Sequence, residues 1–588
     1  MSDGAGRRFL AALLIVLAGA ALLRGAWLTA DPPTRPPQGI IWHDEGAWVH
    51  NARNRALWGA WRTDEWNPIF ITPVFTGLEY AVFRTLGVGT WQARTVPLGS
   101  GLFAIACLAW GLSGVAGRRA ALIGGCLLAT NYVFVMWNRA ALMESTMTAF
   151  IVAAWAAYAR AERRPALGLL AGAAVALAWF TKASAAFFVL ALVADSLATL
   201  MLAWSSGLRD RFGVQAPSGL VRRAAAWTLA GLALAGGLAF AAFVLPHWSE
   251  YSFYNWQMSV MRKPEYTIRA FADRASWLPI VHDYFTRMWL VSAAGSLALV
   301  AIAANWRRAR PAERLLVLWV LLGFAELVVH DSGNERRYVM FIPALIALTS
   351  VLLGRPELLL PGRAELEGRA RWVAIPLVLF LAYLVLGSLV RLAFLQQIGP
   401  AVRTSAALAV VVGALVAWRW GVIGDWLSRQ QIATPAAILL TAITVGGDLA
   451  QYWQWARQRT HLNYEASVQV GRALPPGTLV HGKLANGLSL ENRIRPIFVG
   501  RGFGNYADRK TRDDVRYILT YVAPSLGYES QARNPVIKDV LDAYPNRRVI
   551  MTFNVAETTT GYDRAALIDK FGSGERRDLS HVSGRAQN

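Results

Sequence analysis

The 588-residue sequence has few of the features that keep a protein soluble in water. Charged residues make up only 16% of it, against about a quarter in a typical soluble domain, while 55% of its residues are hydrophobic. It has two cysteines, Cys107 and Cys126, and each lies inside an apolar segment. This placement argues against a disulfide framework or a cysteine-based metal site. The composition predicts a polytopic membrane protein.

Acidic residues are also scarce. The 37 Asp and Glu stand against 59 Lys and Arg, which gives a formal net charge of +22. Much of this excess lies in arginine-rich turns between apolar runs, as the positive-inside rule of membrane proteins describes. The basic character therefore indicates membrane topology, and we expect no nucleic-acid partner.

About thirteen segments are apolar enough to cross a membrane, a distance that needs roughly 20 residues. They lie near 9–28, 91–116, 119–137, 142–159, 166–181, 184–205, 224–245, 288–305, 315–330, 338–354, 372–392, 404–420 and 434–452. The first follows Arg7 and Arg8 and has no convincing cleavage site, which indicates a retained signal-anchor.

Residues 70–86 decide the topology, because they are long enough to cross but contain Pro73, Glu79 and Arg84. We predict that they form a flat helix at the membrane interface, since this choice places all the arginine clusters on the cytoplasmic side. The outer face then holds 29–90, the turns near 138–143, 182, 331–337 and 393–403, the loop 246–287, and everything after about 453.

Beyond Tyr452 the hydropathy falls, and short β-like runs alternate with helical stretches. These runs are Thr478 to His481, Ile497 to Val499, Tyr517 to Val522 and Arg548 to Phe553. We therefore expect an α-helical membrane domain over 1–455 and a small soluble α/β domain over 456–588, on the outer side.

Acidic residues recur in the outer segments. Asp44 and Glu45 are adjacent in Trp42-His43-Asp44-Glu45-Gly46, and Glu144 follows Arg139 in the next outer turn. Taken singly, such residues fit a solvated loop or a helix cap, and Lys182 in the third turn fits a lysine anchoring a helix end. Their common side of the membrane favours a shared site.

Basic residues gather on the same face. The turn His330 to Tyr338 contains Arg336 and Arg337, although the positive-inside rule disfavours arginine on this side. The loop 246–287 contributes His282 and Arg287. Acids and bases together suit a group transfer in which a carboxylate takes a proton from the acceptor, while arginines or a metal ion neutralise a departing phosphate.

In this order and on this side of the membrane, the motifs resemble the GT-C superfamily of membrane glycosyltransferases, particularly the aminoarabinose transferase and protein O-mannosyltransferase clan. The resemblance covers about residues 5–450. It rests on His43 to Gly46, Pro73 to Gly87, Gln92-Ala93-Arg94, Gly117 to Ala121, Arg139 to Glu144, Phe180-Thr181-Lys182 and Glu335 to Tyr338 with Pro343.

The resemblance implies the GT-C fold and roles for individual residues. Asp44 would be the catalytic base, Glu45 a supporting carboxylate and Glu144 a second acid. The donor phosphate contacts would be Arg139, Lys182, Arg287, Arg336, Arg337 and Tyr338. A divalent metal is an open option, with Asp44, Glu65 and His282 as ligands. The family's Glu-Lys-Pro motif is altered, since Asp64 to Pro68 lacks the lysine.

These expectations describe an enzyme of the cytoplasmic (inner) membrane with its active site outside. It would transfer a sugar from a polyprenyl-phosphate donor to a lipid, glycan or protein acceptor, with inversion. Two alternatives stay open at the sequence level: a transporter or flippase of a lipid-linked saccharide, and a non-catalytic envelope assembly protein.

Overall fold

A computed structural model describes most of the chain. The described residues are 3–33, 42–212, 215–261, 268–273, 276, 288–307, 309–330, 335–355, 430–522, 535–558, 561–572 and 577–578, with isolated positions between 379 and 419. The predicted spans at 372–392 and 404–420 lie largely outside this set.

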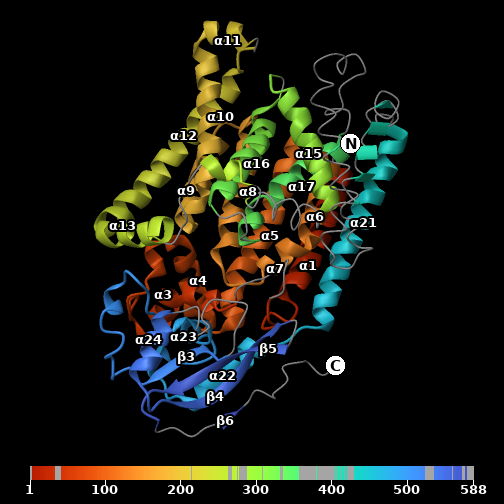
Figure 1. Cartoon of the computed structure of the whole chain (residues 1–588). Coiled ribbons are helices and arrows are strands. Elements are labelled where there is room, and N and C mark those ends of the chain that lie inside the picture. Colours follow the sequence, from red (N-terminus) through yellow and green to blue (C-terminus); the bar gives the residue numbers. More distant parts are fainter. Residues whose placement is uncertain are drawn as a thin grey trace.

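A bundle of helices makes up the first three quarters of the chain (Figure 1). Its long helices are α1 (Asp3–Gly25), α5 (Thr90–Val115), α6 (Gly117–Thr130), α8 (Met143–Ala161), α9 (Leu167–Thr181), α10 (Ala186–Trp204), α12 (Gly219–Ala239), α15 (Trp289–Ala304), α16 (Pro311–His330), α17 (Ile342–Gly354) and α21 (Gln430–Arg457). In the described part of the chain, four helical stretches have the length and apolarity of a span: Gly4–Gly25, Thr90–Val115, Ala183–Trp204 and Gly219–Ser259. The protein is therefore a multi-pass membrane protein.

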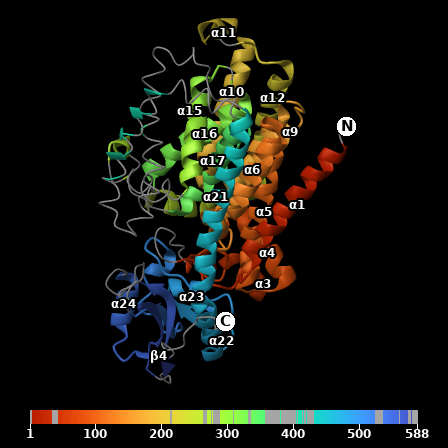
Figure 2. The ribbon, with the colours of Figure 1, turned by 90° about the vertical axis from the view of Figure 1, so that its right-hand side faces the viewer.

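The bundle has two unlike ends. The N-terminus and α11 (Ser206–Phe212), which contains Arg209 and Arg211, lie at one end, and the C-terminal sheet lies at the other (Figure 1). In the side view, α21 runs along the bundle and leads into the sheet (Figure 2). The arginine-rich turn and the sheet are thus separated by the length of the bundle.

The elements of residues 44–86 lie at the sheet end: α2 (Asp44–Trp48), α3 (His50–Trp58), η1 (Pro68–Phe70) and α4 (Pro73–Leu86). A proline at the first turn of α4 suits the start of a helix, because its missing N–H needs no partner there. The 14 residues of α4 extend about 21 Å, too short for a hydrocarbon core of about 30 Å. Length alone does not test the prediction that 70–86 lies flat, because α6 and α17 lie in predicted spans and have 14 and 13 residues.

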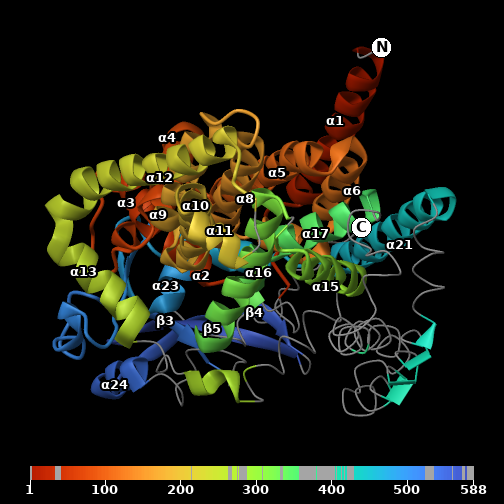
Figure 3. The same cartoon turned by 90° about the horizontal axis from the view of Figure 1, so that it is seen from above.

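The helix that begins at Gly219 continues past the end of the predicted span. Residues 246–259 were expected in an outer loop, but α12 passes through a π-turn (Phe240–Val244) and a 3-10 turn (Leu245–His247) into α13 (Trp248–Trp256). Pro246 lacks an N–H and its ring crowds the preceding turn, so the helix bends here without ending. Viewed from above, α12 and α13 form a bent band along one side (Figure 3).

The predicted span 119–137 is also interrupted. It divides into α6 and α7 (Tyr132–Trp137) at Asn131, whose ψ of 112° is not helical and whose side chain accepts a hydrogen bond from the Phe134 amide. An asparagine in this role caps the second helix, which explains why one apolar run forms two helices.

The C-terminal region contains a six-stranded mixed sheet in the order β2-β1-β3-β5-β4-β6. The strands are β1 (Leu479–His481), β2 (Arg495–Ile497), β3 (Tyr517–Tyr521), β4 (Arg548–Thr558), β5 (Gly561–Asp569) and β6 (Arg577–Asp578). Both β1–β2 and β1–β3 pair in parallel, whereas β5 pairs antiparallel with β3 and β4. Helices α22 (Leu462–Ala473), α23 (Lys483–Gly487) and α24 (Pro535–Ala543) accompany it.

Candidate functional site

The stretch Trp42 to Gly46 lies between the helical bundle and the C-terminal sheet. Two glycines let α2 and α23 approach backbone to backbone. A Cβ on Gly46 would lie 1.9 Å from the Asn486 carbonyl oxygen, and one on Gly487 would lie 2.7 Å from the His43 Cβ. Any larger residue at either position would force the two helices apart. This close contact holds α2 beside the first residue of α23, Lys483.

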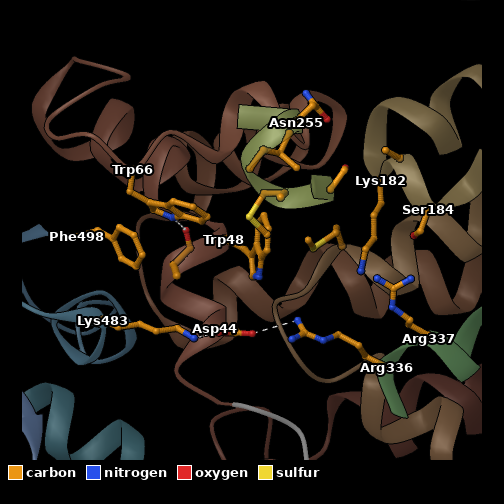
Figure 4. Close-up of a pocket in the computed structure, with 16 residues that line it drawn as sticks. Asp44, Trp48, Trp66, Lys182, Ser184, Asn255, Arg336, Arg337, Lys483 and Phe498 are labelled. Carbon is orange, nitrogen blue, oxygen red and sulfur yellow. Dashed lines mark hydrogen bonds and ion pairs between the residues drawn. The ribbon is translucent and has the colours of Figure 1, made fainter. Parts of the chain in front are cut away.

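A cavity of about 260 Å³ opens next to α2. Its charged lining residues are Asp44, Lys182, Arg336, Arg337 and Lys483. They come from α2, the α9–α10 turn, the 3-10 turn Glu335–Met340 and α23 (Figure 4). Among the residues that the structure describes, four cations and one carboxylate thus line one cavity, and they come from parts of the chain up to about 440 residues apart.

Asp44 stands between two of these cations. Its Oδ1 lies 2.8 Å from Lys483 Nζ, and its Oδ2 accepts a hydrogen bond from Arg336 Nη1 at 3.1 Å (Figure 4). Burial alone would raise the pKa of Asp44, but Lys483, Arg336 and His43 outweigh it and hold the pKa well below its ordinary value. Burial and Lys483 lower the pKa of His43 to about 3, so its imidazole is neutral at pH 7. Asp44 is therefore a buried but ionised carboxylate.

Lys182 connects the cavity to Glu144. Lys182 caps the C-terminus of α9 and forms an ion pair with the Glu144 carboxylate at the start of α8. Glu144 is not a lining residue, but it holds this lysine in place. On the other side, Arg337 Nη1 lies 2.7 Å from Glu326 Oε1 on α16. Within the described part of the chain, cations still outnumber carboxylates when these two partners are included. A bound phosphate would balance that excess.

Glu45 points away from the cavity. Its two oxygens accept hydrogen bonds from Arg94 Nε at 2.8 Å and Arg94 Nη2 at 2.7 Å, and Oε1 also accepts the Ala141 amide at 2.7 Å. Arg94 in turn donates to the Leu28 and Ala30 carbonyls. Glu45 therefore joins α2, α5 and the 138–143 turn, which orients its neighbour Asp44.

The other predicted phosphate contacts lie elsewhere or outside the described residues. Arg139 donates to the carbonyls of Leu23, Arg24 and Trp27, and its guanidinium lies 4.6 Å from the ring centre of Trp455. Tyr338 is buried edge-on against Phe341 and is not a lining residue. Arg287 lies outside the described residues.

The predicted metal ligands do not converge where the structure describes them. Asp44 already has two cationic partners, a setting that disfavours a third cation. Glu65 is exposed and does not line the cavity, and His282 lies outside the described residues. Among the described residues, no cluster of three or more His, Cys, Asp or Glu side chains could hold a metal.

Aromatic side chains form the other wall of the cavity. Trp48, Trp66 and Phe498 line it (Figure 4), and the Trp66 indole is fixed by a 2.7 Å hydrogen bond from Nε1 to the Ala47 carbonyl. Trp66 packs against Trp48 and Phe498 at ring-centre distances of 5.6 and 5.0 Å. Aromatic faces beside cations suit a ligand that has both a sugar ring and a phosphate.

Sequence reasoning missed Lys483. It lies in the region expected to form a separate domain, and no motif surrounds it. The one local signal is the preceding Gly482, whose φ of 111° turns β1 into α23. A Cβ there would lie 2.4 Å from the Leu519 carbonyl oxygen.

No protein-family model and no curated protein sequence matches the chain. Solved structures do match. ArnT from Cupriavidus metallidurans in the apo state has a TM-score of 0.54 and 18% identity, covering 98% of this chain and 99% of that one. ArnT bound to undecaprenyl phosphate has a TM-score of 0.52 and 18% identity, covering 98% and 100%. AglB, the oligosaccharyltransferase of Archaeoglobus fulgidus, has a TM-score of 0.48 and 12% identity, covering 96% and 74%.

The similarity to ArnT extends over nearly the full length of both chains, so it includes the helical bundle and the C-terminal sheet. A structural similarity at 18% identity shows the fold alone. The reaction must therefore be argued from the site. The chain therefore has the overall fold of ArnT, which agrees with the fold that the sequence motifs implied.

Proposed function

We propose that the protein is a membrane glycosyltransferase that moves a sugar from a polyprenyl-phosphate donor to a lipid, glycan or protein acceptor. One observation carries this proposal: a buried, ionised carboxylate, Asp44, shares a cavity with Lys182, Arg336, Arg337 and Lys483. Such a transfer requires a base for the acceptor hydroxyl and cations that bind the departing phosphate. The likeness to ArnT, which was solved with undecaprenyl phosphate, supports the same donor class.

The proposed step is a single displacement. The acceptor hydroxyl gives its proton to Asp44 while the hydroxyl oxygen forms a bond to C1 of the sugar. The bond from C1 to the donor phosphate oxygen breaks on the opposite face, and its electron pair leaves with polyprenyl phosphate. Lys182, Arg336 and Arg337 stabilise the charge that develops on this phosphate. One displacement inverts the configuration at C1.

Membrane embedding follows from the donor. A polyprenyl tail needs an apolar path beside its phosphate, and the cavity is lined both by residues at the ends of bundle helices and by residues of α2 and α23. We place this end of the bundle, with the C-terminal domain, on the outer face of the cytoplasmic membrane, because the arginine-rich turn in α11 lies at the opposite end.

A transporter would need ionisable residues along a path through the bilayer. The described helices do contain such a pair, Asp195 on α10 and Arg314 on α16, at 2.7 Å. However, the two charges neutralise each other, and neither residue lines the cavity. The charged residues that line the cavity lie at one end of the bundle, and this placement favours the transferase.

The test is a comparison of envelope lipids and glycans by mass spectrometry, in cells with the protein, without it, and with Asp44→Asn. We expect a sugar-modified product that is missing from the last two. The rate in Asp44→Asn should fall by roughly 10²- to 10⁴-fold, the usual contribution of a general base.

Two controls make the result specific. Asp542→Asn, which changes an exposed carboxylate on α24 in the same way, should leave the product unchanged. Asp44→Asn should also still bind undecaprenyl phosphate, since the phosphate contacts remain. Full activity in Asp44→Asn would refute its role as base.

A further inference from the structure

The C-terminal region is joined firmly to the outer segment that contains Asp44. Arg53 on α3 is fully buried and donates hydrogen bonds to three carbonyls of the C-terminal region, those of Ser489 (3.1 Å), Asn492 (3.0 Å) and Ile494 (3.0 Å). Such a guanidinium, with no water around it, needs these acceptors. The two segments must therefore fold together.

Further contacts surround the same junction. Asp64 accepts hydrogen bonds from His50 at 2.8 Å and from the Phe498 amide at 2.9 Å, and Asn486 lies 3.1 Å from the second nitrogen of His50. The Trp42 side chain belongs to the apolar core of the C-terminal sheet. The position of Lys483 relative to Asp44 is thus fixed from several sides.

The two oxygens of Asp44 have separate cationic partners. Arg336, which is a phosphate contact in the proposed reaction, binds Oδ2, whereas Lys483 binds Oδ1. When a donor phosphate engages Arg336, Lys483 is the partner that still orients the carboxylate. It is anchored on the sheet through Gly482 and on α2 through the contact between Gly46 and Asn486.

We propose that Lys483 is a positioning residue by which the C-terminal domain aligns Asp44 with the acceptor hydroxyl. The C-terminal domain would then be part of the catalytic machinery, in addition to any part it takes in acceptor binding. This inference rests on the proposed function, because alignment matters only if Asp44 accepts a proton.

The first experiment tests the contact without any activity. A zero-length carbodiimide should join Lys483 Nζ to the Asp44 carboxylate, which lie 2.8 Å apart, and mass spectrometry of the digested full-length protein should show the linked peptides. Asp44→Asn should abolish the link. Its absence in the wild type, while the less exposed ion pair Lys182–Glu144 is linked, would refute the placement.

The second experiment tests the role through three variants. Lys483→Met should lower kcat for transfer by roughly 10- to 100-fold, less than loss of the base itself, with little change in KM for the donor. Lys483→Arg should restore most of the rate. Lys538→Met, in the same domain but away from the cavity, should behave as wild type. Thermal unfolding of each variant shows whether the fold is intact.

The outcomes separate this inference from the proposed function. A higher donor KM with unchanged kcat in Lys483→Met would make Lys483 a phosphate contact and refute the positioning role. Equal loss in Lys483→Met and Lys483→Arg, together with a lower Tm, would make it structural. If the wild type forms the cross-link but transfers no sugar, the proposed function fails while the contact between the two domains stands.

Discussion

Two groups of buried charges in this molecule differ in a way that separates function from structure. Around Asp44, cations outnumber carboxylates and line a cavity. Towards the other end of α8 and α16, Asp195 accepts a hydrogen bond from Tyr158 on one oxygen and from Arg314 on the other, both at 2.7 Å. Arg314 also donates to Thr199 at 3.2 Å.

In the second group, around Asp195, the charges are balanced. One anion meets one cation, both oxygens of Asp195 have donors, and its residues do not line the cavity near Asp44. Burying charge in this balanced form holds helices together at modest net cost. Around Asp44, the described side chains that line the cavity include four cations and one carboxylate. A cavity whose described lining has more cations than carboxylates therefore marks the candidate site.

The largest change in donor affinity should come from removing a cation together with its partner. In the double variant Lys182→Met/Glu144→Gln, the cavity loses a cation while no buried carboxylate is left alone. A charged hydrogen bond contributes about 1.5–3 kcal/mol, so we expect undecaprenyl phosphate to bind roughly 10- to 100-fold more weakly. Equilibrium binding to protein in lipid nanodiscs measures this. Unchanged affinity would show that Lys182 does not contact phosphate.

For the group around Asp44, the sequence predicted which residues come together better than it predicted how they are arranged. Asp44, Lys182, Arg336 and Arg337 were predicted from topology and motif order, because outer turns at adjacent helix ends must lie near each other. Topology alone could not distinguish Asp44 from Glu45, and only the resemblance assigned the base to Asp44. Which of two adjacent carboxylates faces the cavity depends on Arg94 and the Ala141 amide, and this pairing appears only in three dimensions.

Lys483 marks the limit of sequence reasoning. It reaches the site because β1 pairs with β3, Gly482 turns the chain, and two glycines allow α2 to touch α23. The strand pairing and the contact between α2 and α23 are long-range and have no local signature, and Gly482 is the one local signal. The bend at Pro246 was missed for a related reason: a proline ends many helices, but here a π-turn lets the helix continue.

A smaller effect concerns pH. A base must be ionised, so activity is present above its pKa and lost as the pH falls through it. Lys483, Arg336 and His43 hold the pKa of Asp44 below its ordinary value, about 3.9 in model peptides. The acidic limb of kcat/KM due to Asp44 should therefore lie below that value, with similar rates at pH 5 and 7. Arg336→Met should move the limb upwards. A wild-type limb near pH 6 would contradict this assignment.

The smallest effect on activity should come from the balanced group. Asp195→Asn keeps the shape of the side chain but leaves Arg314 without its anion, and breaking a buried pair in this way costs about 3–5 kcal/mol of stability. Thermal unfolding, followed by tryptophan fluorescence, should shift to lower temperature. At a temperature where the variant is folded, kcat and the affinity for undecaprenyl phosphate should match the wild type. The opposite result, an unchanged Tm with lost turnover, would place Asp195 on a substrate path through the bundle and favour transport over transfer. Because Asp44→Asn is the same chemical change in the unbalanced group, the two variants together show whether charge balance distinguishes a structural cluster from a catalytic one.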